Sequence, residues 1–217
     1  MSLLDLARGP LLNVALIVFI VGVLWRLSAL LLLKHRNDLS RARRTDTWWG
    51  GTRAVFSRMW PRQEFFPYVR LQTLMGYTFH IGFAITVFAF VPHITFIRDL
   101  AGLSWPGLPG NLIVLAGAVT LLAMLVLLAR RLTHPVLRLL SGFDDYFSWA
   151  VTAAPLITGL MAYAHLGPRY ETMLAMHILS FDLLLIWFPF GKLMHALLWV
   201  PSRATEGVLF ERKGVEA

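Results

Sequence analysis

The chain of 217 residues is 57% hydrophobic and only 15% charged, and its formal net charge is +8. Average soluble domains are about 45–50% apolar and about 25% charged, so this composition excludes an ordinary soluble domain. The absence of cysteine excludes disulfides, thiolate metal sites and iron–sulfur clusters held by this chain. The composition predicts an all-α integral membrane protein.

Five apolar segments are long enough to cross a bilayer as helices, which takes about 20 residues each. They are residues 11–33, 71–97, 111–132, 146–165 and 173–200. Pro92, Pro155 and Pro189 lie inside three of them and predict local kinks. We interpret the first segment as a retained span, because no basic region and no small-residue cleavage site accompany it. No internal repeat is visible, so residues 1–217 are predicted to form a single five-helix membrane domain.

The basic residues indicate the orientation of this bundle. Fifteen of them lie between the first two spans, after the third span or in the C-terminal tail, and only Arg8, Arg98 and Arg169 lie on the other side. The positive-inside rule then predicts an outside N-terminus and a cytoplasmic C-terminus in a multi-pass protein of the inner (cytoplasmic) membrane. This placement accounts for the net charge without nucleic acid. The basic face could also dock a partner or anionic lipid.

The stretch Thr45–Tyr68 interleaves tryptophan and phenylalanine with arginine. Such a pattern is typical of an amphipathic segment lying at the inner membrane interface. A partner-binding surface has the same pattern, and both interpretations stay open.

Four of the seven histidines form a geometric set. His177 and His195 are 18 residues apart, which is five full turns, so on one helix they share a stripe and lie about 27 Å apart. His80 and His93 are 13 residues apart, or about 20 Å along an antiparallel helix. We therefore expect His80 at the inner level with His195 and His93 at the outer level with His177. Thirteen residues rotate by about 220°, so His93 needs a kink at Pro92 to face the bundle.

Two imidazoles that face each other across an apolar bundle can supply both axial ligands of a b-type haem. Two such pairs predict two haems stacked across the bilayer, with a single haem as the alternative. Taken one at a time, histidines in spans are also ordinary hydrogen-bonded or interfacial residues.

The segments "FHIGFAITVFAF" (79–90) and "FPFGKLMHALLWVP" (188–201) resemble the gamma subunit of respiratory nitrate reductases. The five spans and the histidine spacing are similar too. The resemblance implies a cytochrome b with two b haems that exchanges electrons between quinone or menaquinone and a cytoplasmic iron–sulfur or catalytic subunit. It implies His80 and His195 on the inner haem and His177 on the outer one. This chain departs from the family at His93, because the family's second ligand lies nearer the first. The same type of domain occurs with heterodisulfide-reductase-like partners, so the resemblance does not specify nitrate.

Other polar residues support this interpretation. Lys192 is expected to neutralise a haem propionate, although a lysine there also snorkels. Arg98 and His165 are candidates for an outer quinone site. Arg26 and Asp182 lie inside spans, where a charge costs at least about 2.5–3.5 kcal/mol. We expect them to form an ion pair; alternatively, Asp182 passes protons released by quinol.

The sequence thus predicts a membrane-anchor electron-transfer subunit with no substrate chemistry beyond quinone redox. A haem-free scaffold or transporter is the alternative from another class, although transporters usually show repeats and broken helices around a midplane site. No nucleophile–base pair or phosphate-binding loop indicates an enzyme acting on another small molecule.

Overall fold

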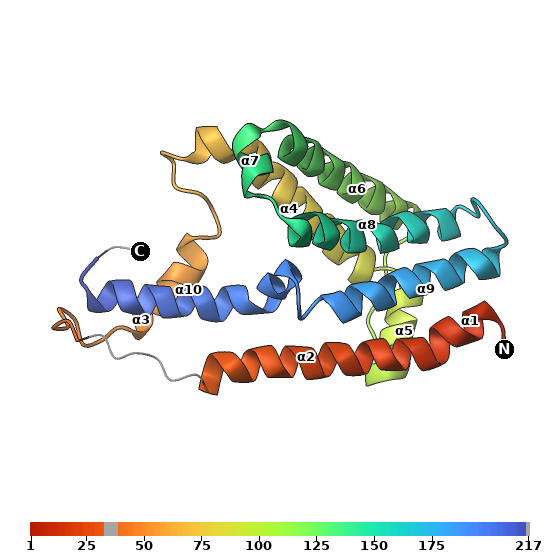
Figure 1. Cartoon of the computed structure of the whole chain (residues 1–217), viewed down its shortest axis with the longest axis horizontal. Coiled ribbons are helices and arrows are strands. Elements are labelled where there is room, and N and C mark those ends of the chain that lie inside the picture. Colours follow the sequence, from red (N-terminus) through yellow and green to blue (C-terminus); the bar gives the residue numbers. More distant parts are fainter. Residues whose placement is uncertain (33–38, 216–217) are drawn as a thin grey trace.

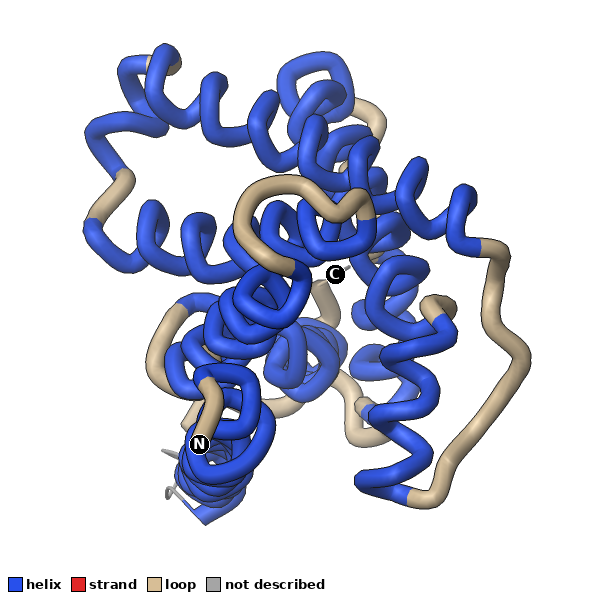
Figure 2. The backbone as a smooth tube through the Cα atoms, turned by 90° about the vertical axis from the view of Figure 1, so that its right-hand side faces the viewer, coloured by secondary structure: helices blue, strands red, loops and turns tan. Residues whose placement is uncertain are grey.

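The computed structural model describes residues 1–32 and 39–215, and in that part of the chain every regular element is a helix. Figure 2 shows these helices joined by loops. The long helices are α2 (Leu12–Leu32), α4 (Phe66–Phe88), α6 (Gly110–Thr133), α8 (Phe143–Tyr163), α9 (Tyr170–Trp187) and α10 (His195–Arg212). The short ones are α1 (Leu3–Leu6), the π-turn η1 (Ala7–Leu11), α3 (Trp48–Ser57), α5 (Val91–Ala101), α7 (Pro135–Leu140) and the 3₁₀ turn η2 (Lys192–Met194).

The long helices form an open row rather than a closed bundle. In that row α4 packs on α6, α6 on α8, α8 on α9, and α9 on α2 (Figure 1). The centre of the row is a small core in which Met124, Ala153 and Leu156 are buried against Phe79 and Trp149. Within the described residues, α4 makes no extensive packing against α9 or α10.

Four helical segments are long and apolar enough to span a membrane: Leu3–Leu32, Phe66–Phe88, Gly110–Thr133 and Tyr170–Trp187. The protein is therefore an all-helical, multi-pass membrane protein. The predicted span 146–165 is the helix α8, which is not among the four. Many of its residues are buried among neighbouring helices, including the polar Ser148 and Thr152. A helix covered in this way does not need an apolar surface all round.

The predicted second span, 71–97, is wrong as one helix. α4 ends at Phe88, Phe90 is extended, and α5 begins at Val91 with Pro92 in its first turn. Proline has no N–H to continue a helix and restricts the residue before it, so the chain restarts as a new helix. His80 and His93 therefore lie on different helices, and a common helical face is not required of them.

The predicted fifth span, 173–200, is also wrong as one helix. His177 and His195 therefore lie on two helices, and the expectation that they share one helical stripe is wrong as well. α9 ends at Trp187, and α10 starts only at His195. Pro189 lies in the break and packs directly against Gly22 of α2, where a Cβ would come within 2.5 Å of the proline ring. The break therefore follows both from the missing N–H and from this contact.

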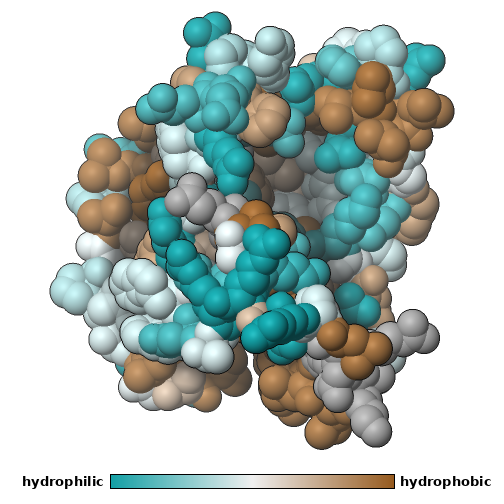
Figure 3. Space-filling view, turned by 90° about the vertical axis from the view of Figure 1, so that its left-hand side faces the viewer, coloured by the Kyte–Doolittle hydropathy of each residue, from teal (hydrophilic) through white to brown (hydrophobic). Residues whose placement is uncertain are grey.

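The helices α3 and α10 pack together beyond the row of long helices (Figure 1). Gly50 and Gly207 meet at the crossing, and a Cβ on Gly207 would come within 2.5 Å of Ala54. Trp48 and Trp49 are exposed on the other side of α3. Seen from the end that carries α3 and α10, hydrophilic residues occupy the middle of the face and hydrophobic residues lie around its rim (Figure 3).

We predict that Gly207→Val separates α3 from α10, because the added methyl groups have no room against the Gly50 carbonyl. Overpacking of this kind costs about 1–3 kcal/mol. Limited trypsin digestion should then cut faster at Arg53 in the variant. Gly9→Ala is the control, since a Cβ at Gly9 meets nothing within 4 Å. Equal digestion of both variants would contradict this crossing.

Candidate functional site

Two pairs of histidine rings face each other between α4 and α5 on one side and α9 and α10 on the other. His80 of α4 faces His195 of α10, with ring centroids 6.1 Å apart and planes at 87°. His93 of α5 faces His177 of α9, with centroids 6.1 Å apart and planes at 16°. The pairing expected from the sequence is thus observed, although four helices take the place of the two continuous helices assumed for it.

The separation of the rings has a chemical meaning. A metal–imidazole bond is about 2 Å long and a ring centre lies about 1 Å beyond its nitrogen, so two rings on opposite sides of one metal ion have centroids about 6 Å apart. Both pairs match that separation. Among the described residues no group of three or more His, Asp or Glu side chains could hold a metal ion.

One nitrogen of each imidazole is anchored by the protein. Nδ1 of His80 lies 2.7 Å from the Gly76 carbonyl, and Nδ1 of His195 lies 2.7 Å from the Lys192 carbonyl. A carbonyl oxygen only accepts, so Nδ1 carries the proton and Nε2 keeps a free lone pair. Histidine ligands of metals almost always have their other nitrogen bonded in this manner.

The second pair, His93 with His177, is anchored by the break after α4 and by α8. His93 Nδ1 lies 3.1 Å from the Thr86 carbonyl and 3.2 Å from that of Val87, two of the last carbonyls of α4. His177 Nδ1 lies 3.3 Å from Thr158 Oγ1, and that hydroxyl donates to the Ala154 carbonyl at 2.7 Å. The Thr158 oxygen therefore accepts from His177.

Two glycines, Gly159 and Gly76, lie beside the paired histidines. A Cβ on Gly159 would come within 2.9 Å of the His177 ring, so only glycine lets α8 approach that histidine. Gly76, whose carbonyl anchors His80, faces open space within 4 Å. His80 and His195 are exposed in the chain alone, and His93 and His177 are half-buried.

An open pocket of about 450 Å³ adjoins His195 and is lined by residues of α10 and by Arg58, which directly follows α3. Within it Arg58 is paired with Glu206, whereas Arg203 lies over the Trp199 ring, 5.4 Å from its centroid. In the described part of the chain Arg203 makes no ion pair. The pocket therefore presents a cation beside the pair of His80 and His195.

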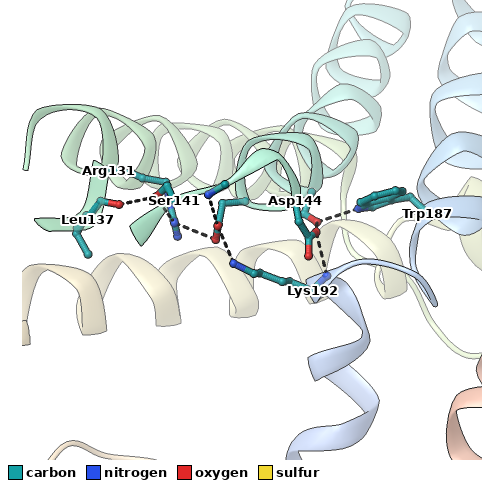
Figure 4. A network of polar contacts seen from close by, with 9 residues as sticks. Arg131, Leu137, Ser141, Asp144, Trp187 and Lys192 are labelled. Carbon is teal, nitrogen blue, oxygen red and sulfur yellow. Dashed lines mark hydrogen bonds and ion pairs between the residues drawn. The ribbon is translucent and has the colours of Figure 1, made fainter. Parts of the chain in front are cut away.

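Lys192 does not line this pocket, and its polar groups have partners in the protein. Its ammonium donates to Asp145 at 2.6 Å, and its backbone N–H donates to Asp144 at 3.1 Å (Figure 4). The sequence predicted a haem propionate as the partner of Lys192, and that assignment stays a prediction; in the described chain the ammonium pairs with Asp145. Sequence reasoning missed these aspartates, although two adjacent carboxylates at the start of a predicted span were a visible signal.

The two quinone-site candidates are not brought together. Arg98 pairs with its neighbour Asp99 at 3.2 Å, and the His165 ring contacts the Tyr170 ring at 5.1 Å. His165 has a positive φ of 52°. This is explained by the end of α8, because the N–H groups of His165 and Leu166 close a Schellman motif on that helix. His165 is thus a helix-terminating residue, whatever else it does.

The expected ion pair between Arg26 and Asp182 is not formed. Asp182 is buried at 4% exposure, and neither of its carboxyl oxygens has a hydrogen-bond partner among the described residues. Arg26 lies on the exposed face of α2. The two residues therefore point to different surroundings, although both lie inside apolar helices.

Asp145, at the start of α8 and just before the predicted span, yields a pH prediction. Burial alone would raise its pKa, but hydrogen bonds from Lys192 and Gly142 and the charge of Arg131 outweigh burial and hold the pKa below its usual range. Ionised Asp145 therefore stabilises the fold above the ordinary aspartate pKa of about 4. That contribution should be lost as the pH falls through the lowered pKa. Thermal unfolding in detergent between about pH 7 and pH 3 should show a smaller decline for Asp145→Asn than for the native chain. Parallel declines would contradict this role.

Comparison with known proteins finds a relative of this chain. No family model matches the chain, and no solved structure matches it. A protein of Nitratidesulfovibrio vulgaris (strain Hildenborough), described only as "Protein", is 30% identical over 212 residues, an alignment that covers 92% of this chain and 90% of the relative. The chain therefore belongs to the same family as this Nitratidesulfovibrio vulgaris protein, whose name states no activity.

Proposed function

We propose that the protein is a five-span, diheme cytochrome b subunit that transfers electrons between the membrane quinone pool and a cytoplasmic redox partner. The observation that carries the proposal is the presence of two histidine pairs, each with ring centroids 6.1 Å apart. One pair at that separation could arise from helix packing. Two pairs, each with its Nδ1 atoms bonded to protein oxygens, support the proposal that each pair would hold one haem through its Nε2 atoms.

Haem bound by each pair would supply one-electron redox chemistry. The chain's own part is to hold Nε2 of His80 and His195, and of His93 and His177, toward each other. The surrounding apolar helices exclude water, which helps to determine the reduction potential. Gly76 and Gly159 leave room for a flat ring system and for the His177 imidazole.

The propionate role moves from Lys192 to Arg203 in this proposal. Arg203 lies in the pocket beside His195 and makes no ion pair within the described residues, whereas the Lys192 ammonium is bound to Asp145. A carboxylate in that pocket would meet a guanidinium whose position is supported by the Trp199 ring. Trp199 and Arg203 are one helical turn apart, so their contact is local to α10.

The membrane placement in this proposal has the N-terminus outside and α3 with α10 in the cytoplasm. The distribution of basic residues supports it, as does the hydrophilic middle of the face at the α3–α10 end (Figure 3). The predicted span 146–165, which begins after Asp145, is the fifth span and is shielded by the neighbours of α8. The exposed Trp48 and Trp49 on α3 then provide a surface for the cytoplasmic iron–sulfur or catalytic partner.

Quinol oxidation is proposed beside the pair of His93 and His177, on the outer side, from which electrons pass inward. The resemblance to nitrate reductase gamma subunits supports this direction and leaves the terminal acceptor open. Because Arg98 and His165 have separate local partners, they enter the quinone site only as individual candidates.

The haem content of the purified chain tests the proposal. In detergent, the dithionite-reduced minus oxidised spectrum and the pyridine haemochrome assay should give two b haems per native chain. His93→Ala should reduce this to one, because it removes an axial nitrogen from the second pair. His134→Ala, at an exposed histidine that ends α6, is the control and should keep two.

Each other result has a defined meaning. Two haems in His93→Ala would move the fourth ligand to another residue. One haem in the native chain would leave a monohaem relay. A correctly assembled native chain without haem would refute the cytochrome and favour a scaffold or transporter.

Labelling of introduced cysteines tests the orientation, and the native chain offers no competing thiol. Ser57→Cys ends α3 and Ser104→Cys lies between α5 and α6, and both positions are exposed. In intact cells a membrane-impermeant maleimide should label Cys at 104 and spare Cys at 57. After lysis both should react. The opposite pattern in intact cells would invert the proposed topology.

A further inference from the structure

We propose that Asp144, Asp145 and Lys192 form a clamp that positions the His195 ring, and that positioning is the role of Lys192. The inference rests on the proposed function, in which His195 is an axial ligand. It assigns a task to a group of charges that the proposal above leaves unused. Figure 4 shows the group where α8 begins and the chain passes from α9 toward α10.

The clamp is needed because His195 follows a weak element. Between the end of α9 at Trp187 and the start of α10 at His195, the chain forms only the three-residue turn η2. Short 3₁₀ turns have poorer hydrogen-bond geometry than α-helices, so η2 by itself holds its carbonyls loosely. The protein anchor of the His195 ring is the Lys192 carbonyl in this turn, at 2.7 Å. The direction of that carbonyl therefore decides where Nε2 of His195 points.

Lys192 is held by two contacts, one at its backbone N–H and one at its side-chain ammonium. Asp144 accepts from its backbone N–H at 3.1 Å, and Asp145 accepts from its ammonium at 2.6 Å. The two contacts restrain the backbone before the Lys192 Cα and the side chain on it. The Lys192 carbonyl itself accepts from the His195 backbone N–H within η2, and this bond limits the remaining rotation that aims the carbonyl at the His195 ring. Two adjacent carboxylates are required because each one serves a different part of the lysine.

The carboxylates themselves are fixed by α6, α8 and α9. Asp145 is 8% exposed and also accepts from Arg131 at 3.0 Å and from the Gly142 N–H at 3.0 Å. Asp144 accepts from Ser148 at 2.7 Å, and that hydroxyl accepts from the Trp187 indole N–H at 2.9 Å. The clamp thus makes the position of His195 depend on α6, α8 and α9 as well as on α10.

Gly191 supports the same reading. A Cβ at this residue would collide with the Trp187 indole nitrogen and come within 3.0 Å of Asp144. Its φ of −98° is open to any residue, so the requirement for glycine at this point is spatial. Glycine lets the indole and the carboxylate close over the turn immediately before Lys192.

The test compares Asp145→Asn and Lys192→Met with Glu211→Gln in the full haem-loaded chain. Asp145→Asn keeps the shape and removes the charge, whereas Glu211→Gln removes the same charge from an ion pair with Arg44 at the far end of α10. Lys192→Arg is the conservative variant that should restore the native result. Hydrogen–deuterium exchange of residues 188–198 reports on the turn, and transfer of haem to apomyoglobin reports on ligation.

We expect about tenfold faster exchange at residues 188–198 in Asp145→Asn and Lys192→Met, as for the loss of one charge-assisted hydrogen bond. One of the two haems should be lost about 10-fold to 100-fold faster, the usual effect of removing the partner of a metal-bound histidine. The retained haem should show the electron paramagnetic resonance signal of the pair with nearly parallel rings, His93 with His177, because ring orientation shapes that signal. Glu211→Gln should match the native chain in all three measurements.

The remaining outcomes separate this inference from the proposed function. Faster exchange with unchanged haem transfer and resonance signals would reduce the clamp to a structural contact and overturn the positioning role. Unchanged exchange would overturn the clamp. A native chain without haem would refute the proposed function and with it the positioning of a ligand, whereas faster exchange would still uphold the clamp as a fastening of the turn.

Discussion

The arrangement of the site depends on one constraint, which is that each imidazole must give one nitrogen to the protein so that the other can face its partner. Hydrogen bonds within helices leave few carbonyls available for this purpose, and the free ones lie where helices end. Two of the four histidines use such carbonyls. His93 bonds to Thr86 and Val87 at the end of α4, and His195 bonds to Lys192 in the turn before α10. The breaks in the helices and the placement of the rings are therefore one feature.

The open row of helices follows from the same requirement. If α4 packed closely on α9, no space would remain for anything between the two pairs of rings. Instead α6 and α8 separate them, and α8 carries buried hydroxyls and small residues that suit its central place. Thr158 and Gly159 on this helix support His177 by a hydrogen bond and by close approach. α8, which is not among the four segments apolar enough to span a membrane, thus contributes directly to the site.

The charged residues near α3 and α10 differ in whether they are paired within the protein. Asp144 and Asp145 engage Lys192, Glu206 engages Arg58, and Arg203 is left in the pocket beside His195. Counting basic residues predicts which side of the membrane they occupy but not which of them is already paired. We propose that the anion-binding role expected of Lys192, in the turn η2, belongs to Arg203 on α10.

The sequence by itself determined the helical membrane class and the four histidines whose rings pair in the structure. Both depend on local properties, namely the length and apolar character of segments and the spacing of rare ionisable residues within them. The levels of the histidines were also predictable, because antiparallel neighbours bring early and late residues together. The tertiary structure decided where α4 and α9 end, since Pro92 and Pro189 are compatible with either a kink or a break. It also decided that Lys192 pairs with Asp145 and that Asp182 does not pair with Arg26. Those partnerships join segments far apart in the chain, and only their packing brings the charged atoms within reach.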